Sequence, residues 1–268
     1  MDLQAIKRVV VKVGTSTLTY STGKLNLRRI EQLVRCLSDL KNRGYDVVLV
    51  SSGAMGVGVG KLSLKCRPEN IPAKQAVSAI GQCELMSIYD RMFAEYCQTV
   101  AQILLTKTDL ETEVKKQNVT NTFDQLMKYD TIPIVNENDT VATEEIEFGD
   151  NDTLSALVAK LIHADLLILL SDIDGLYDQD PHHHPSAKLI PVVKEITDEI
   201  KASASGAGSR RGTGGMITKL IAADIATSAG CDMIIANGER PEILFDIFEG
   251  EFRGTLFQKK NDYFSQNI

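Results

Sequence analysis

Histidine is scarce in this sequence of 268 residues, which contains only four, and tryptophan is absent. His163 lies within an apolar helical pattern, and the other three are consecutive, His182–His184, between two prolines. These three could hold a metal, but their setting favours a solvated loop. The sequence therefore offers no Ser-His-Asp or Cys-His arrangement for nucleophilic catalysis.

Paired cysteines, long apolar runs and excess basic charge are lacking as well. The five cysteines form no C-x-x-C motif and are odd in number, which favours free thiols in a reducing compartment. No apolar run reaches the ~18 residues of a membrane span, and the first residues lack the apolar core of a signal peptide. A net charge of −7 argues against nucleic acid as a partner. We therefore expect a cytoplasmic protein with neither a membrane nor a nucleic acid as its partner.

Apolar runs alternate with helical patterns along the chain. Residues 9–13 are almost all β-branched and predict a strand buried on both faces. Further strands are predicted at 46–50, 100–105, 131–135 and 166–170, then at 233–236, with a last apolar segment at 255–257. Helices are predicted at 26–43, 73–96, 117–129 and 152–163, after the glycines that precede Met216, and at 241–249. Pro133 conflicts with a central position for its strand. The alternation predicts an α/β fold with a mainly parallel sheet and helices on both faces.

The glycine-rich segment Gly212–Lys219 precedes a helical pattern and ends in a lysine. Glycines let the backbone approach an anion, and the N–H groups of a helix start with one ammonium suit a phosphate. A surface loop before an ordinary helix is the alternative. The segment differs from a P-loop, whose G-x-x-x-x-G-K-[ST] pattern occurs nowhere in the chain.

Lys12 interrupts the first strand and precedes Gly14-Thr15-Ser16. A lysine at this point faces a cavity, a charge or solvent, because unpaired burial is costly. Gly149–Asp152 brings two carboxylates and an amide to a helix start, where they could cap the helix, orient lysines or hold Mg²⁺.

Two polar segments follow strands, where ligands bind to open α/β sheets. Asn136–Asp139 is either a polar turn or a set of partners for a zwitterion. Ser52–Gly56 supplies either packing glycines or backbone donors to a carboxylate. The shortage of histidine favours phosphoryl transfer to a carboxylate over transfer to a hydroxyl, because a carboxylate needs no base to remove a proton.

Together these motifs resemble the amino acid kinase family. The resemblance runs from about residue 9 to 257 and includes, besides the segments above, Phe148–Asp152, Leu154-Ser155-Ala156 and Asp174-Gly175-Leu176-Tyr177. It implies a three-layer αβα sandwich with a mainly parallel central sheet. It also implies one kinase domain over residues 1–258, with an amino-acid site in the N-terminal half and a nucleotide site in the C-terminal half. Residues 259–268 would be a tail, without the RNA-binding-like PUA domain of many relatives.

The resemblance implies ATP-dependent phosphorylation of the γ-carboxylate of L-glutamate to L-glutamyl 5-phosphate, the first step of proline synthesis. The implied catalytic residues are Lys12, Lys219 and Asp152, and the implied glutamate ligands are Ser52, Gly53, Asp139 and Asn151. The implied ATP contacts are Lys12, Ser171, Asp172, Thr213, Gly214, Gly215, Met216, Ile217, Thr218 and Lys219. Mg²⁺ would be held mainly by the ATP phosphates, with Asp150 as a further candidate.

The resemblance also implies a homo-oligomer, inhibition by proline near 136–147 and a downstream reductase that consumes the acyl phosphate. Two alternatives stay open. One is a sibling kinase such as N-acetylglutamate kinase or aspartokinase. The other is a non-catalytic sensing module, which the retention of both Lys12 and Lys219 disfavours.

Overall fold

The computed structural model describes residues 2–20, 24–141, 151–181, 183–204 and 215–260. The chain divides into two compact units. Unit 1 consists of Met1–Lys12 and Gly149–Ile268, and unit 2 is the continuous segment Val13–Phe148. Both units alternate strands and helices, as the sequence predicts.

Unit 1 is built on the strand order β1-β5-β7-β8-β6. Strands β5 and β7 are parallel, with Leu166 opposite Asp232 and Ser171 opposite Asn237. Strand β8 runs antiparallel to β7 and parallel to β6. The elements of this unit are η1 (Leu3–Ala5), β1 (Arg8–Val13), α7 (Asn151–Leu161), β5 (Leu166–Ser171), β6 (Val192–Val193), α8 (Asp198–Ala204), α9 (Met216–Ser228), β7 (Asp232–Asn237), α10 (Ile243–Glu249) and β8 (Gly254–Phe257).

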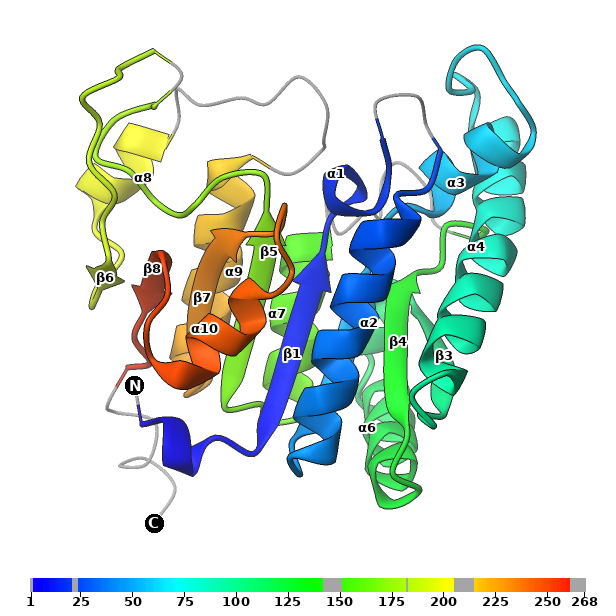
Figure 1. Ribbon diagram of the computed structural model, residues 1–268, viewed down its shortest axis with the longest axis horizontal. Coiled ribbons are helices and arrows are strands. Elements are labelled where there is room, and N and C mark those ends of the chain that lie inside the picture. Colours follow the sequence, from blue (N-terminus) through cyan, green and yellow to red (C-terminus); the bar gives the residue numbers. More distant parts are fainter. Residues whose placement is uncertain (1, 21–23, 142–150, 182, 205–214, 261–268) are drawn as a thin grey trace. The chain divides into compact units, whose positions relative to one another are not determined.

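Helices cover both faces of the strands in unit 1. Helix α10 lies in front of β7 in Figure 1, and α7 and α9 lie behind the strands. Helix α7 packs on α9 and β5, and α9 packs on β7. Every residue of β5 is buried, and Val9, Val10 and Val11 of β1 are fully buried. Burial on both faces explains why these strands read as continuous apolar runs.

Unit 2 contains the parallel strand order β3-β4-β2. Helix α2 packs on β2 and α4, α4 packs on β3, and α6 packs on β4. The elements are α1 (Thr15–Leu18), α2 (Leu27–Asn42), β2 (Asp46–Ser51), α3 (Ala54–Lys61), α4 (Ile71–Ala94), β3 (Val100–Leu105), α5 (Lys107–Glu111), α6 (Glu113–Lys128) and β4 (Ile132–Glu137). The predicted fold class, an α/β fold with a mainly parallel sheet between helices, is confirmed.

Pro133 lies in a strand with neighbours on both sides, which is the central position that the sequence argues against. The N–H of Ile132 points toward β3, where it donates to Thr99 O. Successive N–H groups alternate sides, so the missing N–H of Pro133 faces β2. The register with β2 begins only at Ile134. The proline therefore occupies a point at which the ladder to β2 has not yet begun.

Helix α3 was not predicted, because three of its eight residues are glycines, which disfavour helix. Glycine is required here by close packing on α4. A Cβ on Gly58 would lie 2.0 Å from Val77 O, and one on Gly81 would lie 1.7 Å from Ala54 O. The sequence does not predict the short helices α1, α5 and α8 either, since so few residues give no clear periodicity.

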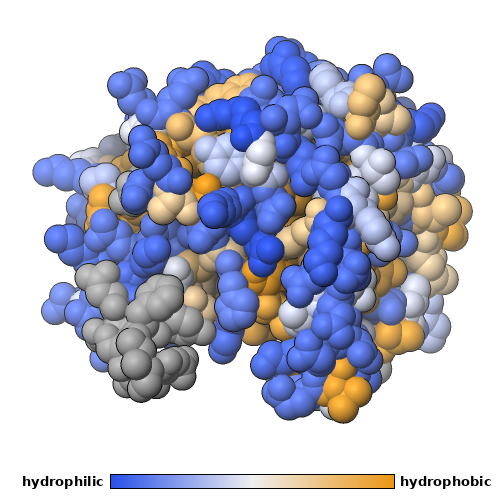
Figure 2. Space-filling view, turned by 90° about the horizontal axis from the view of Figure 1, so that it is seen from below, coloured by the Kyte–Doolittle hydropathy of each residue, from blue (hydrophilic) through white to orange (hydrophobic). Residues whose placement is uncertain are grey.

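The surface shown in Figure 2 is mainly hydrophilic, with hydrophobic residues scattered between polar ones. Across the described ranges, every helix is too short or too polar to cross a lipid bilayer. All five cysteines are free thiols, as expected from their number and spacing.

Candidate active site

Two lysines from distant parts of the sequence meet at one carboxylate in unit 1. Lys12 lies near the carboxyl end of β1, Asp152 in the first turn of α7 and Lys219 in the first turn of α9. Lys12 Nζ lies 2.6 Å from Asp152 Oδ1, and Lys219 Nζ lies 3.1 Å from Asp152 Oδ2. The structure therefore brings together all three residues that the resemblance assigns to catalysis. We call them the Lys–Asp–Lys cluster.

The Lys–Asp–Lys cluster is buried and carries one excess positive charge. The Asp152 side chain is fully buried, and the side chains of Lys12 and Lys219 are 11% and 7% exposed. Burial alone would raise the pKa of Asp152, but the two ammonium groups more than offset it and hold that pKa below its usual value. The carboxylate is thus ionised, and two cations face one anion. Such a surplus is suited to an anionic group that arrives at the cluster.

The N-terminus of α9 lies beside this cluster. Gly215 is the N-cap in an extended conformation, and within the described residues no side chain caps the helix. Thr218 Oγ1 lies 2.7 Å from Gly215 O and 3.2 Å from Asp152 Oδ2. Uncapped N–H groups at a helix start favour a phosphate. Ile217 is half exposed, whereas Thr213 and Gly214 lie outside the described residues, as does Asp150.

Ser171 and Asp172 lie at the carboxyl end of β5, the edge at which ligands bind in open α/β sheets. Ser171 is buried, and its Oγ donates to Asp172 Oδ1 at 3.1 Å. The Asp172 side chain is exposed. Gly238 N donates to Ser171 O at 2.7 Å, which continues the pairing of β5 with β7 beyond the strands.

A second polar cluster at this edge was missed by sequence reasoning. Asp174 accepts hydrogen bonds from Asn237, Tyr177 and Arg253. Although burial opposes ionisation, these three donors lower the pKa of Asp174. Asp174 and Tyr177 belong to a motif that carries the family resemblance, but no local signal marks Arg253 or Asn237.

The residues assigned to glutamate are divided between the two units. Ser52, Gly53 and Asp139 belong to unit 2, whereas Asn151 is the first residue of α7 in unit 1. Ser52 N donates to Val13 O at 3.0 Å, and Gly53 adopts a φ of +106° as the N-cap of α3. That φ favours glycine, so Gly53 has a conformational reason to be glycine. Asp139 lies half-buried after β4.

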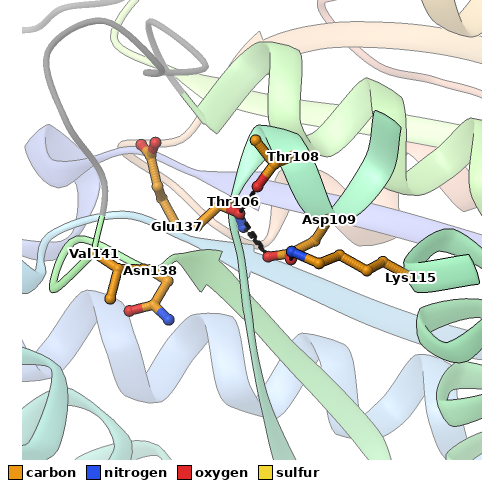
Figure 3. A pocket seen from close by; sticks show the side chains of 7 residues that line it. All are labelled: Thr106, Thr108, Asp109, Lys115, Glu137, Asn138 and Val141. Atoms are coloured by element: carbon orange, nitrogen blue, oxygen red, sulfur yellow. Dashed lines mark hydrogen bonds and ion pairs between the residues drawn. The ribbon is translucent and has the colours of Figure 1, made fainter. Parts of the chain in front are cut away.

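A polar pocket of about 360 Å³ lies at the carboxyl ends of β3 and β4 in unit 2 (Figure 3). Asp109 Oδ2 accepts from both the N–H and the hydroxyl of Thr106, and Asp109 Oδ1 accepts from Lys115. Despite partial burial, these donors lower the pKa of Asp109. The pocket is lined by Thr106, Thr108, Asp109, Lys115, Glu137, Asn138 and Val141.

Among the described residues, His, Cys, Asp and Glu form no group of three that could hold a metal ion. Asp152, although buried and ionised, has both oxygens next to lysine ammonium groups, so it is unsuited to bind Mg²⁺. His183 and His184 are exposed, as expected for a solvated loop.

The buried lysines, the uncapped helix start and the position at the carboxyl ends of the strands are suited to an anionic ligand. Residues 7–237 match the model of the amino acid kinase family. The chain belongs to this family, as its motifs predict.

Curated relatives match almost the whole chain. The glutamate 5-kinase of Clostridium perfringens is 60% identical over 262 residues, which cover 96% of this chain and 97% of the relative. The glutamate 5-kinase of Listeria innocua is 54% identical over 270 residues, with 99% and 98% covered.

Solved structures of other kinases share the fold at low identity. The carbamate kinase from Giardia lamblia bound to AMP-PNP has a TM-score of 0.69 at 17% identity, and the alignment covers 96% of this chain and 99% of that one. UMP kinase from Ureaplasma parvum has a TM-score of 0.66 at 13% identity, with 95% and 99% covered. At these identities the likeness concerns the fold alone.

Proposed function

We propose that this chain transfers the terminal phosphoryl group of ATP to the γ-carboxylate of L-glutamate, forming L-glutamyl 5-phosphate for proline synthesis. The observation that carries the proposal is the Lys–Asp–Lys cluster, with its two buried ammonium groups around one ionised carboxylate. The name shared by relatives at 54–60% identity over nearly the full chain supports glutamate as the acceptor.

The roles follow from charge. The transferring phosphoryl group and the attacking carboxylate are both anions, so the reaction needs alignment and positive charge rather than a base. Lys12 and Lys219 stabilise the transferring group, and Asp152 holds the two lysines in position. Their enclosure strengthens the electrostatic interaction, because a buried charge is poorly screened by water.

ATP contacts Lys12, Ser171 and Asp172, together with Thr213–Lys219. The uncapped start of α9 supports this assignment, since its N–H groups are suited to a phosphate. Glutamate contacts Ser52, Gly53, Asp139 and Asn151. The two substrates are thus assigned mainly to the C-terminal and N-terminal halves of one kinase domain spanning residues 1–258.

Mg²⁺ held by the phosphates of ATP would neutralise part of their charge. The pairing of Asp152 with both lysines supports this division, because it leaves the cluster to the phosphoryl group rather than to a metal. Asp150 is the remaining candidate for a protein ligand.

The acceptor is tested with a panel of acids. Release of ADP is measured with L-glutamate, N-acetylglutamate, aspartate and carbamate, in the presence of hydroxylamine to convert an acyl phosphate into a hydroxamate. Turnover and hydroxamate are expected with glutamate. Turnover with another acid and none with glutamate would contradict the proposal in favour of a sibling kinase. ATP binding without turnover of any acid would favour a sensing module.

Regulation and assembly complete the proposal. Proline competes with glutamate near residues 136–147, a range that includes Glu137, Asn138 and Val141 of the pocket in unit 2. The enzyme acts in the cytoplasm as a dimer or tetramer, and a reductase consumes its product. If the proline concentration that halves the rate does not rise with glutamate concentration, competition is contradicted. Analytical ultracentrifugation measures the oligomer, and a monomer at assay concentration would contradict the assembly.

A further inference from the structure

Asp174 connects the segment after β5 with the end of β7 and with the residue before β8. Its Oδ1 accepts from Nδ2 of Asn237, the last residue of β7, at 2.9 Å. Its Oδ2 accepts from Arg253 Nε, which precedes β8, at 2.8 Å and from the Tyr177 hydroxyl at 3.1 Å. Asp174 itself follows the end of β5 by three residues. One carboxylate therefore connects β5, β7 and β8 at their ligand-binding edge.

A second contact fixes the same segment. Gly175 lies so close to β8 that a Cβ would be 2.4 Å from Thr255 Oγ1 and 2.9 Å from Thr255 N. Thr255 Oγ1 accepts from Leu176 N at 2.8 Å and donates to Ile190 O at 2.7 Å. Residues 174–177 thus contact β8 through the backbone and Arg253, the residue before β8, through the carboxylate.

The residues immediately before this anchored segment are Ser171 and Asp172, which the proposed function assigns to ATP. We propose that Asp174 is a positioning residue for the nucleotide. By holding residues 171–177 against β7 and β8, it fixes the direction in which Ser171 and Asp172 present their side chains. The proposal rests on the proposed function for the identity of the ligand, a nucleoside phosphate.

The solvent exposure of the Asp174–Arg253 ion pair indicates that the pair contributes more to the orientation of residues 171–177 than to the stability of the fold. The Asp174 side chain is 25% exposed and that of Arg253 is 72% exposed. Solvent-exposed ion pairs contribute little to stability. An arrangement of three donors around one carboxylate, however, restricts its direction strongly. A small displacement of positioning groups is enough to weaken a bound substrate.

The test measures ADP binding by isothermal titration calorimetry, with Mg²⁺ and without glutamate. Asp174→Asn retains the volume of the side chain but removes the charge that faces Arg253, and Arg253→Ala removes one donor. Asp174→Asn is expected to weaken ADP binding on the order of 10-fold and Arg253→Ala by about 3-fold, because each loosens the orientation of residues 171–177. The KM for glutamate should stay within about twofold of the original value, since its assigned ligands are elsewhere.

Lys260→Ala is the matched control. The substitution breaks another exposed ion pair of unit 1, in which Lys260 Nζ lies 3.1 Å from Asp224 Oδ1. Lys260 follows the carboxyl end of β8, whereas Arg253 precedes its amino end. ADP affinity should be unchanged in this variant. If Asp174→Asn fails to fold, Arg253→Ala decides the question, because the Arg253 side chain is mostly exposed and its removal should leave the fold intact.

Unchanged ADP affinity in both Asp174→Asn and Arg253→Ala would overturn the proposal. Equal weakening of ADP and glutamate, accompanied by a lower urea midpoint, would also overturn it, because a general structural role produces that pattern. The proposed function fails separately, since a chain that binds ADP but does not phosphorylate glutamate contradicts the acceptor and leaves the role of Asp174 in nucleotide binding intact.

Discussion

Replacing Asp152 with asparagine tests the Lys–Asp–Lys cluster most directly. The substitution keeps the shape of the side chain but leaves two buried ammonium groups without a counter-charge. Removing one partner of a buried ion pair costs about 3–5 kcal/mol. For a chain of this size, 1 kcal/mol corresponds to roughly 2 °C in the melting temperature. Asp152→Asn should therefore melt roughly 6–10 °C lower by this reasoning.

The same variant should separate binding from catalysis. Its cluster carries two excess positive charges instead of one, and a unit charge at 4 Å is worth about 4 kcal/mol at an effective dielectric constant of 20. ATP should consequently raise the melting temperature of the variant by more than that of the original protein. The kcat should nevertheless fall by at least ~100-fold, because the lysines are no longer held in position.

Differential scanning fluorimetry with and without ATP, combined with the ADP-release assay, measures both effects. Asp224→Asn is the control, since Asp224 pairs with Lys260 on the surface and its side chain is half exposed. A melting temperature within 1 °C of the original, judged against the ~2 °C per kcal/mol scale, together with near-normal kcat in Asp152→Asn, would refute the reasoning.

Three further predictions follow from burial and packing. Folding lowers the pKa of Asp152, so the stabilisation by its carboxylate is present above the unfolded pKa of about 3.9 and is lost as the pH falls below that value. The difference in melting temperature between the original protein and Asp152→Asn should therefore shrink from neutral pH toward pH ~3. A constant difference would contradict the assignment. Gly81→Ala should lower the free energy of unfolding by about 1–3 kcal/mol or more and raise the KM for glutamate, because the new methyl displaces Ala54 beside Gly53. Gly44→Ala is the control: Gly44 has a φ of +92° and open space around it, so this variant should leave the KM unchanged. Thr255→Val should lower the free energy of unfolding by about 1–3 kcal/mol in urea titrations, since Leu176 N loses its acceptor. Thr255→Ser keeps the hydroxyl group, so an equally large loss in that variant would argue against this hydrogen bond as the cause.

The strands and the cluster were accessible from the sequence for different reasons. Continuous β-branched runs predict strands buried on both faces, and β1 and β5 are such strands. Lys12 and Lys219 stand out because each accompanies glycines at the start or end of an element. Their meeting at Asp152 came from the family resemblance, since no pattern within the chain specifies which carboxylate lies between them.

What the sequence did not reveal depends on long-range contacts. Asp174 meets Asn237 and Arg253 across 63 and 79 residues. Helix α3 forms despite its glycines because α4 packs against it at a distance that excludes side chains. In both cases tertiary packing overrides local preference, which single-residue propensities do not include.

The division of the chain has a consequence for synthesis on the ribosome. Unit 2 is continuous, so its residues can fold as soon as they emerge, whereas Met1–Lys12 must wait for residues after 148. Lys12 is made before unit 2, yet Lys219 joins it only after unit 2 has been translated. A nascent chain released before α9 would accordingly contain a folded unit 2 but have no means of phosphorylation.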